Sequence, residues 1–73
     1  MQETFITAKG RLLVKFDSFQ DGDWQVTRWQ NPVLKDIFTH AVHKNGEENF
    51  HTARNYRVCL SLDDCYEEAR DLF

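Results

Sequence analysis

The sequence lacks the features that several protein classes require. One proline and three glycines among 73 residues exclude collagen-like and Pro/Gly-rich low-complexity chains. No heptad repeat runs through the chain, which excludes a coiled coil. The longest strictly apolar runs are three residues, such as Leu12–Val14, whereas a membrane-spanning helix needs about 20. A chain this short with 14% aromatic residues predicts one folded domain over residues 1–73, without a linker, a tail or a membrane contact.

Cysteine is also scarce. Cys59 and Cys65 are too few for a secreted mini-domain, which usually has two to four disulfides. Their C-x5-C spacing disfavours a zinc pair, and a position of Cys59 on a strand and Cys65 one turn into a helix makes a bridge awkward. The amino-terminal residues have no basic region and no apolar region of a signal peptide. We therefore expect two reduced thiols in a cytoplasmic protein.

Catalytic motifs are missing. The chain has no G-x-S-x-G, no Gly-rich phosphate loop and no H-E-x-x-H. Glu47–Glu48 and Asp63–Asp64 are adjacent carboxylates, which differ from the opposed pair that flanks a cleft. We therefore predict a protein that is not an enzyme and that holds no cofactor and no metal.

What the sequence has begins with strand patterns. Residues 3–8 and 11–17 are rich in β-formers around a Lys9–Gly10 turn. Asp21–Gly22 predicts the next turn, and the following segment, residues 23–29, is again typical of a strand. The first thirty residues therefore predict a three-stranded meander.

The middle of the chain predicts a helix. Asn31 is a good N-cap and Pro32 suits the first helical position. Six apolar residues then follow at the helical period, and Asn45–Gly46 ends the segment. These six are Val33, Leu34, Ile37, Phe38, Ala41 and Val42. The alternative is a type I′ hairpin at Asn45–Gly46, between strands over residues 39–44 and 47–52.

The last part predicts a strand and a second helix. Residues 55–62 alternate apolar and polar side chains, as in a half-buried strand. Ser61 starts a near capping box, and an amphipathic helix is expected to run to Phe73. The predicted fold class is α+β, an antiparallel sheet of about four strands with two amphipathic helices in the order β-β-β-α-β-α.

Both faces of the predicted sheet carry apolar residues. With two-residue turns, Phe5 lies opposite Val14, Trp29 lies on the face of Val14, and Trp24 lies on the face of Leu13. A slip of one residue exchanges the tryptophans, so neither is assigned to a face, but each face carries one. An uncovered apolar face usually marks an interaction site.

Charge is uneven along the chain, whose net charge is −3. Residues 61–73 hold five carboxylates and one arginine, a net charge of −4, whereas eight basic and seven acidic residues give the first sixty a net charge of +1. Such an acidic helix can steer a basic partner, although a solvated helix face is the simpler interpretation. Aromatic residues at the Asp21–Gly22 turn are good candidates for binding hot spots.

The first functional hypothesis is therefore a small non-catalytic protein-binding regulator or inhibitor, of the kind that phages and mobile elements encode. Its partner is another protein, and a homodimer through a sheet face or edge strand is a further expectation. The residues predicted to bind the partner are Phe19, Trp24, Trp29, Asp64, Glu67, Glu68 and Asp71.

The alternative hypothesis is a single-stranded nucleic-acid-binding module. Basic residues lie on or beside strands that carry aromatic side chains, which is how many single-strand binders work. The net charge of −3 and the lack of a basic cluster argue against it, because phosphate binding depends on positive charge. The candidate residues are Arg11, Lys15, Arg28 and Arg57.

One weak metal pattern remains. On the predicted middle helix, Asp36, His40 and His43 share the polar side, with His51 or Glu47 as a further ligand. Histidines on an exposed helix face are usually just solvated, and the prediction stays at no metal.

Overall fold

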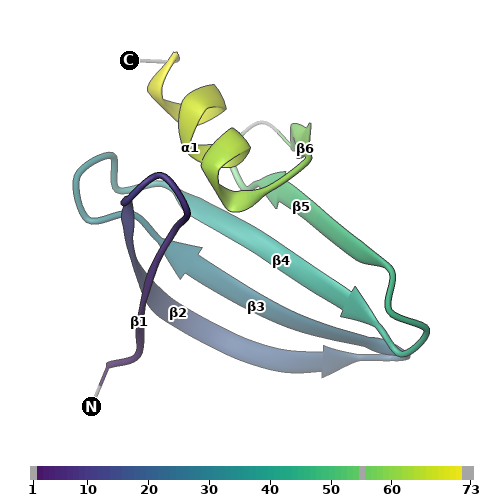
Figure 1. Ribbon diagram of the computed structural model, residues 1–73. Helices are drawn as coiled ribbons and strands as arrows, with labels where there is room; N and C mark the ends of the chain where they lie inside the picture. Colours follow the sequence, from purple (N-terminus) through teal and green to yellow (C-terminus); the bar gives the residue numbers. More distant parts are fainter. Residues whose placement is uncertain (1, 55, 72–73) are drawn as a thin grey trace.

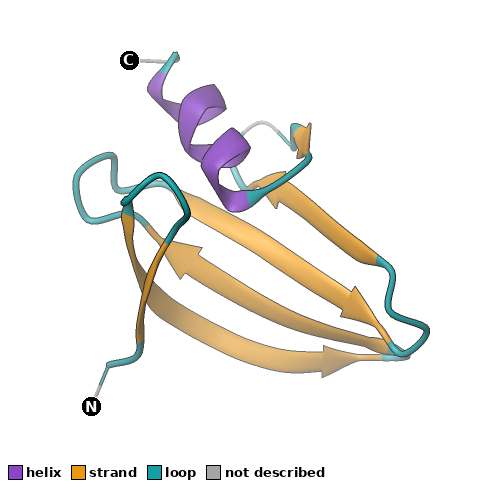
Figure 2. Cartoon of the chain, viewed as in Figure 1, coloured by secondary structure: helices purple, strands orange, loops and turns teal. Residues whose placement is uncertain are grey.

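The protein is described by a computed structural model over residues 2–54 and 56–71. Six antiparallel strands lie side by side in sequence order, and one helix follows them (Figures 1 and 2). The elements are β1 (Thr4–Ile6), β2 (Leu12–Asp21), β3 (Trp24–Gln30), β4 (Ile37–His43), β5 (Glu48–Thr52), β6 (Val58–Cys59) and α1 (Leu62–Arg70). Within these residues no helix has the length and apolar character needed to cross a membrane.

The predicted fold class is wrong. The expected four strands and two helices are replaced by six strands and one helix, because the middle segment forms the hairpin β4–β5. The alternative hairpin at Asn45–Gly46 is thus correct. The central strand β4 is apolar on both faces, with Phe38 opposite Trp29 on one face and Ala41 opposite Val26 on the other. The apolar residues of this segment come in adjacent pairs that repeat every four positions. Such a pattern fits one face of a helix, but it also fits a strand that is buried on both faces.

The capping signal at Asn31 is real but local. Its Oδ1 accepts hydrogen bonds from the backbone N–H groups of Val33 (3.0 Å) and Leu34 (2.7 Å). Its Nδ2 donates to the Leu12 carbonyl at 3.0 Å. Lys35 then adopts a positive φ of 57° and turns the chain back into β4. Asn31 therefore caps a tight turn between two strands, not a helix.

The registers also differ from the predicted ones. The first connection spans Thr7 to Arg11, so that Phe5 lies opposite Leu13 instead of Val14. The second turn is centred on Gly22 and Asp23, one residue later than expected, and β2 has a bulge at Phe16. Each change shifts the pairing between neighbouring strands by one residue relative to the prediction.

The shift of one residue in the register between β2 and β3 determines on which face of the sheet each tryptophan lies. Trp29 lies opposite Lys15 and so shares the face of Leu13, while Trp24 lies on the other face. The expectation that each face carries one tryptophan is confirmed.

The carboxyl-terminal region matches the prediction in part. Ser61 caps α1, since its Oγ accepts from the Asp64 N–H at 3.1 Å. The preceding strand is shorter than residues 55–62, because β6 contains only Val58 and Cys59. The expected helix end at Phe73 lies outside the described residues.

The core lies between α1 and one face of the sheet, where α1 packs against β4, β5 and β6. We call this the covered face and the opposite one the open face. Cys59 and Cys65 are free thiols in this core, on the strand and the helix as expected, and burial raises the pKa of both. The buried core residues are Leu13, Leu34, Phe38, Cys59, Leu62, Cys65 and Ala69.

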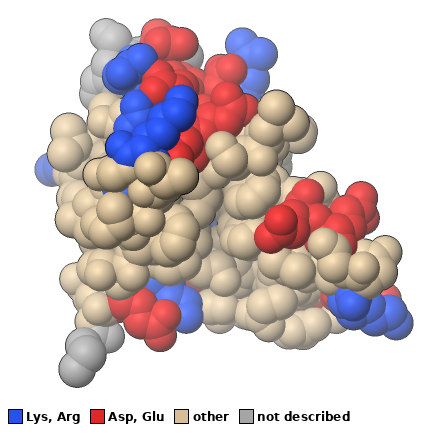
Figure 3. All heavy atoms as spheres, viewed as in Figure 1, with Lys and Arg blue, Asp and Glu red and all other residues tan. Residues whose placement is uncertain are grey.

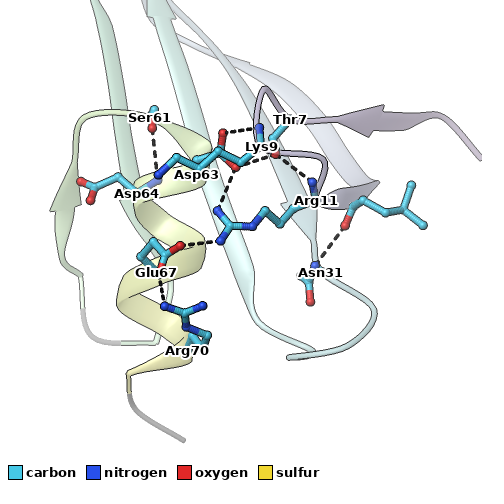
Figure 4. Close-up of polar contacts among 10 residues, drawn as sticks. Thr7, Lys9, Arg11, Asn31, Ser61, Asp63, Asp64, Glu67 and Arg70 are labelled. Atoms are coloured by element: carbon cyan, nitrogen blue, oxygen red, sulfur yellow. Dashed lines mark hydrogen bonds and ion pairs between the residues drawn. The ribbon is translucent and has the colours of Figure 1, made fainter.

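Charged side chains of both signs gather over α1 (Figure 3). The close-up in Figure 4 shows how Asp63 joins the helix to the β1–β2 connection. One carboxylate oxygen accepts from the Thr7 hydroxyl at 2.5 Å and from Arg11 at 3.3 Å, and the other accepts from the Lys9 N–H at 3.2 Å. Arg11 also pairs with Glu67. The helix is thereby anchored by one nearly buried carboxylate.

This anchor sets the charge state of Asp63. Burial alone would raise the pKa of its carboxyl, but the donors from Thr7, Lys9 and Arg11 outweigh that cost and lower it below the ordinary value of 3.8. A carboxyl with a lowered folded-state pKa stabilises the fold above its unfolded pKa. That contribution is lost as the pH falls through the folded-state value.

The substitution Asp63→Asn tests the anchor. We expect a loss of about 1–3 kcal/mol of unfolding free energy at pH 7, because buried donors lose an ionised acceptor. The difference from wild type should begin to shrink below about pH 4, where the carboxyl of the unfolded chain protonates, and it should be lost as the pH falls through the lower folded-state pKa of Asp63. Urea unfolding at pH 7, 5 and 3 measures both. Glu3→Gln, at an exposed pair with Lys15, is the control and should change little. A loss that is equal at all three pH values would contradict the role of the ionised carboxylate.

Candidate functional site

The open face carries a groove of about 530 Å³. It crosses strands β2 to β5 and ends at the segment before β6. Its residues are Phe19, Asp21, Trp24, Val26, Arg28, Thr39, Ala41, Asn49, His51, Ala53 and Tyr56. No element of the described chain covers this face as α1 covers the other.

The floor and the rim of the groove differ in exposure. Val26, Thr39 and Ala41 form a buried floor of small side chains on the two central strands. Two aromatic residues stand at the rim, Phe19 with 43% and Tyr56 with 79% of its surface exposed. Small residues below and aromatic residues beside them make a depression that an inserted side chain can fill.

Arg28 is held rigidly beside the floor. Its Nε donates to Asp17 Oδ1 at 2.7 Å and its Nη2 pairs with the second oxygen. The guanidinium carbon lies 5.3 Å from the ring centre of Phe16 and 5.6 Å from that of Phe19. Bonding to Arg28 lowers the pKa of the Asp17 carboxyl and raises that of Arg28, so both groups stay charged. Such a bidentate ion pair fixes the Arg28 side chain before any partner binds.

The other aromatic side chains of the groove are paired with histidines. The rings of His51 and Tyr56 stack with centres 5.5 Å apart, and the rings of Trp24 and His43 are nearly perpendicular with centres 4.7 Å apart. Tyr56 has a positive φ of 55°, which is strained for an aromatic residue. The chain thus accepts backbone strain where it places an exposed ring at the end of the groove.

The structure brings together only two of the predicted partner-binding residues. Phe19 and Trp24 flank the same groove, on β2 and β3. Trp29 lies on the covered face, in contact with the core. The predicted acidic residues lie on α1 and just after it, away from the groove, so the seven residues do not form one surface.

Most of the helix acids have partners within the chain. Asp64 accepts from the Leu60 N–H at 3.0 Å, and Glu67 pairs with Arg11 and Arg70. Glu68 lies 3.6 Å from Arg57, whereas Asp71 forms the C-cap of the helix. The acidity of α1 therefore serves the attachment of the helix.

The four candidate nucleic-acid residues are also paired. Each has a carboxylate within 4 Å, which offsets its charge toward a phosphate. They are spread over both faces and do not gather in one basic strip. The pairs are Arg11 with Asp63 and Glu67, Lys15 with Glu3, Arg28 with Asp17 and Arg57 with Glu68.

The metal pattern does not form. Positions three apart on a strand point to opposite faces, so β4 separates His40 from His43. His40 pairs with Glu48 at 3.0 Å, and His43 lies 4.0 Å from Asp23. Among the described residues no three His, Cys, Asp or Glu side chains come together as metal ligands.

Several residues in or beside the groove were not among the predicted partner-binding residues. Phe16 and Asp17 join Arg28 because a bulge shifts the register of β2, and no sequence signal marks that bulge. His51 and Tyr56 depend on the hairpin β4–β5, whose signal at Asn45–Gly46 was present as the alternative.

Comparison with known proteins finds no matching family model, no matching curated protein and no matching solved structure.

Proposed function

We propose that this protein is a small non-catalytic regulator or inhibitor that binds another protein through the groove of the open face. The observation that carries the proposal is the position of Phe19 and Trp24 beside a buried floor of small residues, next to an arginine already fixed by Asp17. The two free, buried thiols support a reducing compartment, and we place the protein in the cytoplasm.

The side chains of the groove are those that contribute most at protein interfaces. Trp, Tyr and Arg dominate binding hot spots, mainly where they enclose a desolvated pocket. Arg28 is already held by Asp17 and lies near two aromatic rings, so little conformational entropy is lost when a partner contacts it. The central strands β3 and β4 are hydrogen-bonded to a neighbouring strand on both sides and give the groove a rigid base.

The helix acids have a smaller part in this proposal. They hold α1 to the sheet, and their remaining negative charge can accelerate the approach of a basic partner without adding much affinity. The binding energy is therefore assigned to the open face.

Alanine substitutions test whether the binding energy comes from the groove and not from the acidic residues of α1. Trp24→Ala and Phe19→Ala should each weaken partner binding by tenfold or more, since a desolvated hot-spot aromatic costs about 2 kcal/mol when truncated. Glu68→Ala, at an exposed pair on α1, should change affinity little. The partner is first captured from the native host, and each variant is then titrated calorimetrically after circular dichroism confirms its fold. If Glu68→Ala weakens binding more than the two aromatic variants, the groove is not the binding site.

Single-stranded nucleic acid is the alternative ligand, favoured by the aromatic rings at the groove. We expect no binding of a thymidine oligonucleotide tighter than about 100 µM at 150 mM salt, because the arginines are already paired. Tryptophan fluorescence over a salt series measures this. Tight binding that weakens steeply with salt and is lost in Arg28→Ala would favour the nucleic-acid hypothesis over the protein-binding one.

A further inference from the structure

The sheet has two edges, β1 and β6, and in the described chain neither has a neighbouring strand on its outer side (Figure 1). A free edge displays unpaired backbone N–H and C=O groups, which are a template for another strand. Natural edges are usually blocked by charged side chains, proline, a bulge or a covering element. The two edges of this sheet differ in how far they are blocked.

On its inner side, β1 is regularly paired with β2. The Lys15 N–H donates to the Glu3 carbonyl at 2.8 Å, and the Thr7 N–H donates to the Arg11 carbonyl at 3.0 Å. The pairing therefore runs from residue 3 to residue 7, beyond the three residues of the strand itself. The backbone of this edge is held straight along its whole length.

The outer side of β1 carries free backbone groups. Residues that bond to a neighbour alternate with residues that do not along an antiparallel strand. Since residues 3 and 7 bond to β2, Phe5 does so too, and the N–H and C=O groups of Thr4 and Ile6 point away from β2. Within the described residues these outward groups have no hydrogen-bond partner.

The side chains of β1 leave the edge open. All three residues of the strand are exposed, and none of them is charged, proline or glycine. Phe5 is 44% and Ile6 is 57% exposed, and the pairing of β1 with β2 contains no bulge. A strand added here would bury apolar surface and also satisfy the backbone.

The opposite edge is largely closed by its own chain. Since the Thr52 N–H donates to the Arg57 carbonyl at 3.0 Å, the alternation leaves only Val58 with outward backbone groups in the two-residue strand β6. The next outward N–H, that of Leu60, donates to Asp64 Oδ2 at 3.0 Å. Of the two edges, β1 is therefore the one that can receive a strand.

We propose that two copies of the chain associate through β1, which pairs antiparallel with β1 of the second copy. The alignment that uses every outward group places Thr4 opposite Ile6 of the second copy, with two hydrogen bonds at each such pair. It places Phe5 opposite Phe5. The two six-stranded sheets then form one continuous sheet, and the two-fold symmetry closes the assembly at two chains.

Charge and symmetry favour a second copy as the occupant. Across residues 2–8 of this alignment the only charged residue is Glu3, which lies opposite Thr7 of the second copy, so no like charges meet. The two Phe5 side chains meet in a non-hydrogen-bonded pair, where facing side chains are closest and aromatic pairs are favourable. Because the paired strands are short, we expect a weak dimer with a Kd of about 0.1 mM.

Sedimentation velocity of the protein alone tests the association. Between about 10 µM and about 1 mM, the mean mass of the wild type should rise from that of one chain toward that of two. Ile6→Pro replaces an outward N–H with a ring and leaves the bonds to β2 in place, so dimerisation should weaken tenfold or more. Val58→Pro makes the same change on β6 and is the matched control, which should dimerise as wild type does. Circular dichroism confirms the fold of both variants.

A charge exchange at Phe5 tests the alignment even if a proline variant fails to fold. Phe5→Lys and Phe5→Glu each bring two like charges face to face, so each should stay monomeric at the highest concentration. An equimolar mixture of the two variants should dimerise again, because opposite charges then meet across the pair.

Three outcomes would overturn the proposal. They are a wild type that keeps the mass of one chain at the highest concentration, Ile6→Pro that dimerises as wild type does, and a mixture of the Phe5 variants that stays monomeric. Loss of the dimer in Val58→Pro would assign the contact to β6 instead. A monomeric wild type whose captured protein partner is lost in Ile6→Pro would assign the β1 edge to an extended segment of that partner. The groove is tested separately, because this experiment uses the protein without a partner.

Discussion

A single helix of nine residues has to shield a sheet of six strands, and it covers one face only. The rest of the structure follows from this mismatch. The core forms where α1 meets β4, β5 and β6, and the opposite face keeps aromatic side chains at its surface. A small domain has too little chain to bury both faces of a sheet. The groove is one consequence, because it lies on the face that the helix leaves open.

The helix stays in place through Asp63. Its carboxylate gathers donors from the connection between β1 and β2, so that residues more than fifty positions apart in sequence are held together. Thr7 and Asp63 also line a largely apolar pocket of about 290 Å³ on the covered face, beside Trp29. A carboxylate in that position also offsets the charge of Arg11, which lowers the attraction of the protein for nucleic acid.

The sequence predicts local features better than their arrangement. Turns at Gly10 and Gly46, the Asn31 cap and the Ser61 cap were all recognisable, because each depends on a few neighbouring residues. The middle segment was wrongly predicted as a helix, because adjacent apolar pairs that repeat every four residues fit both a helix and a central strand that is buried on both faces.

The candidate site was predictable only in part. Phe19 and Trp24 could be proposed from their place beside a turn, but the partners of Arg28 could not, because a bulge in β2 has no sequence signature. The acidic helix looked like a docking surface since intramolecular ion pairs at large sequence separation are not visible in one sequence. Folding brought Arg11 and Arg57 to those acids.

Hydroxyl-radical footprinting of the monomer tests most directly whether the sheet has one open face. Phe16 and Phe19 are 53% and 43% exposed on that side, whereas Phe38 beneath the helix is fully buried. The structure predicts rapid oxidation of the first two rings and protection of the third, measured by mass spectrometry at a protein concentration where light scattering shows a single chain. Equal protection of all three rings would mean that both faces are covered, and the account of the groove would fail.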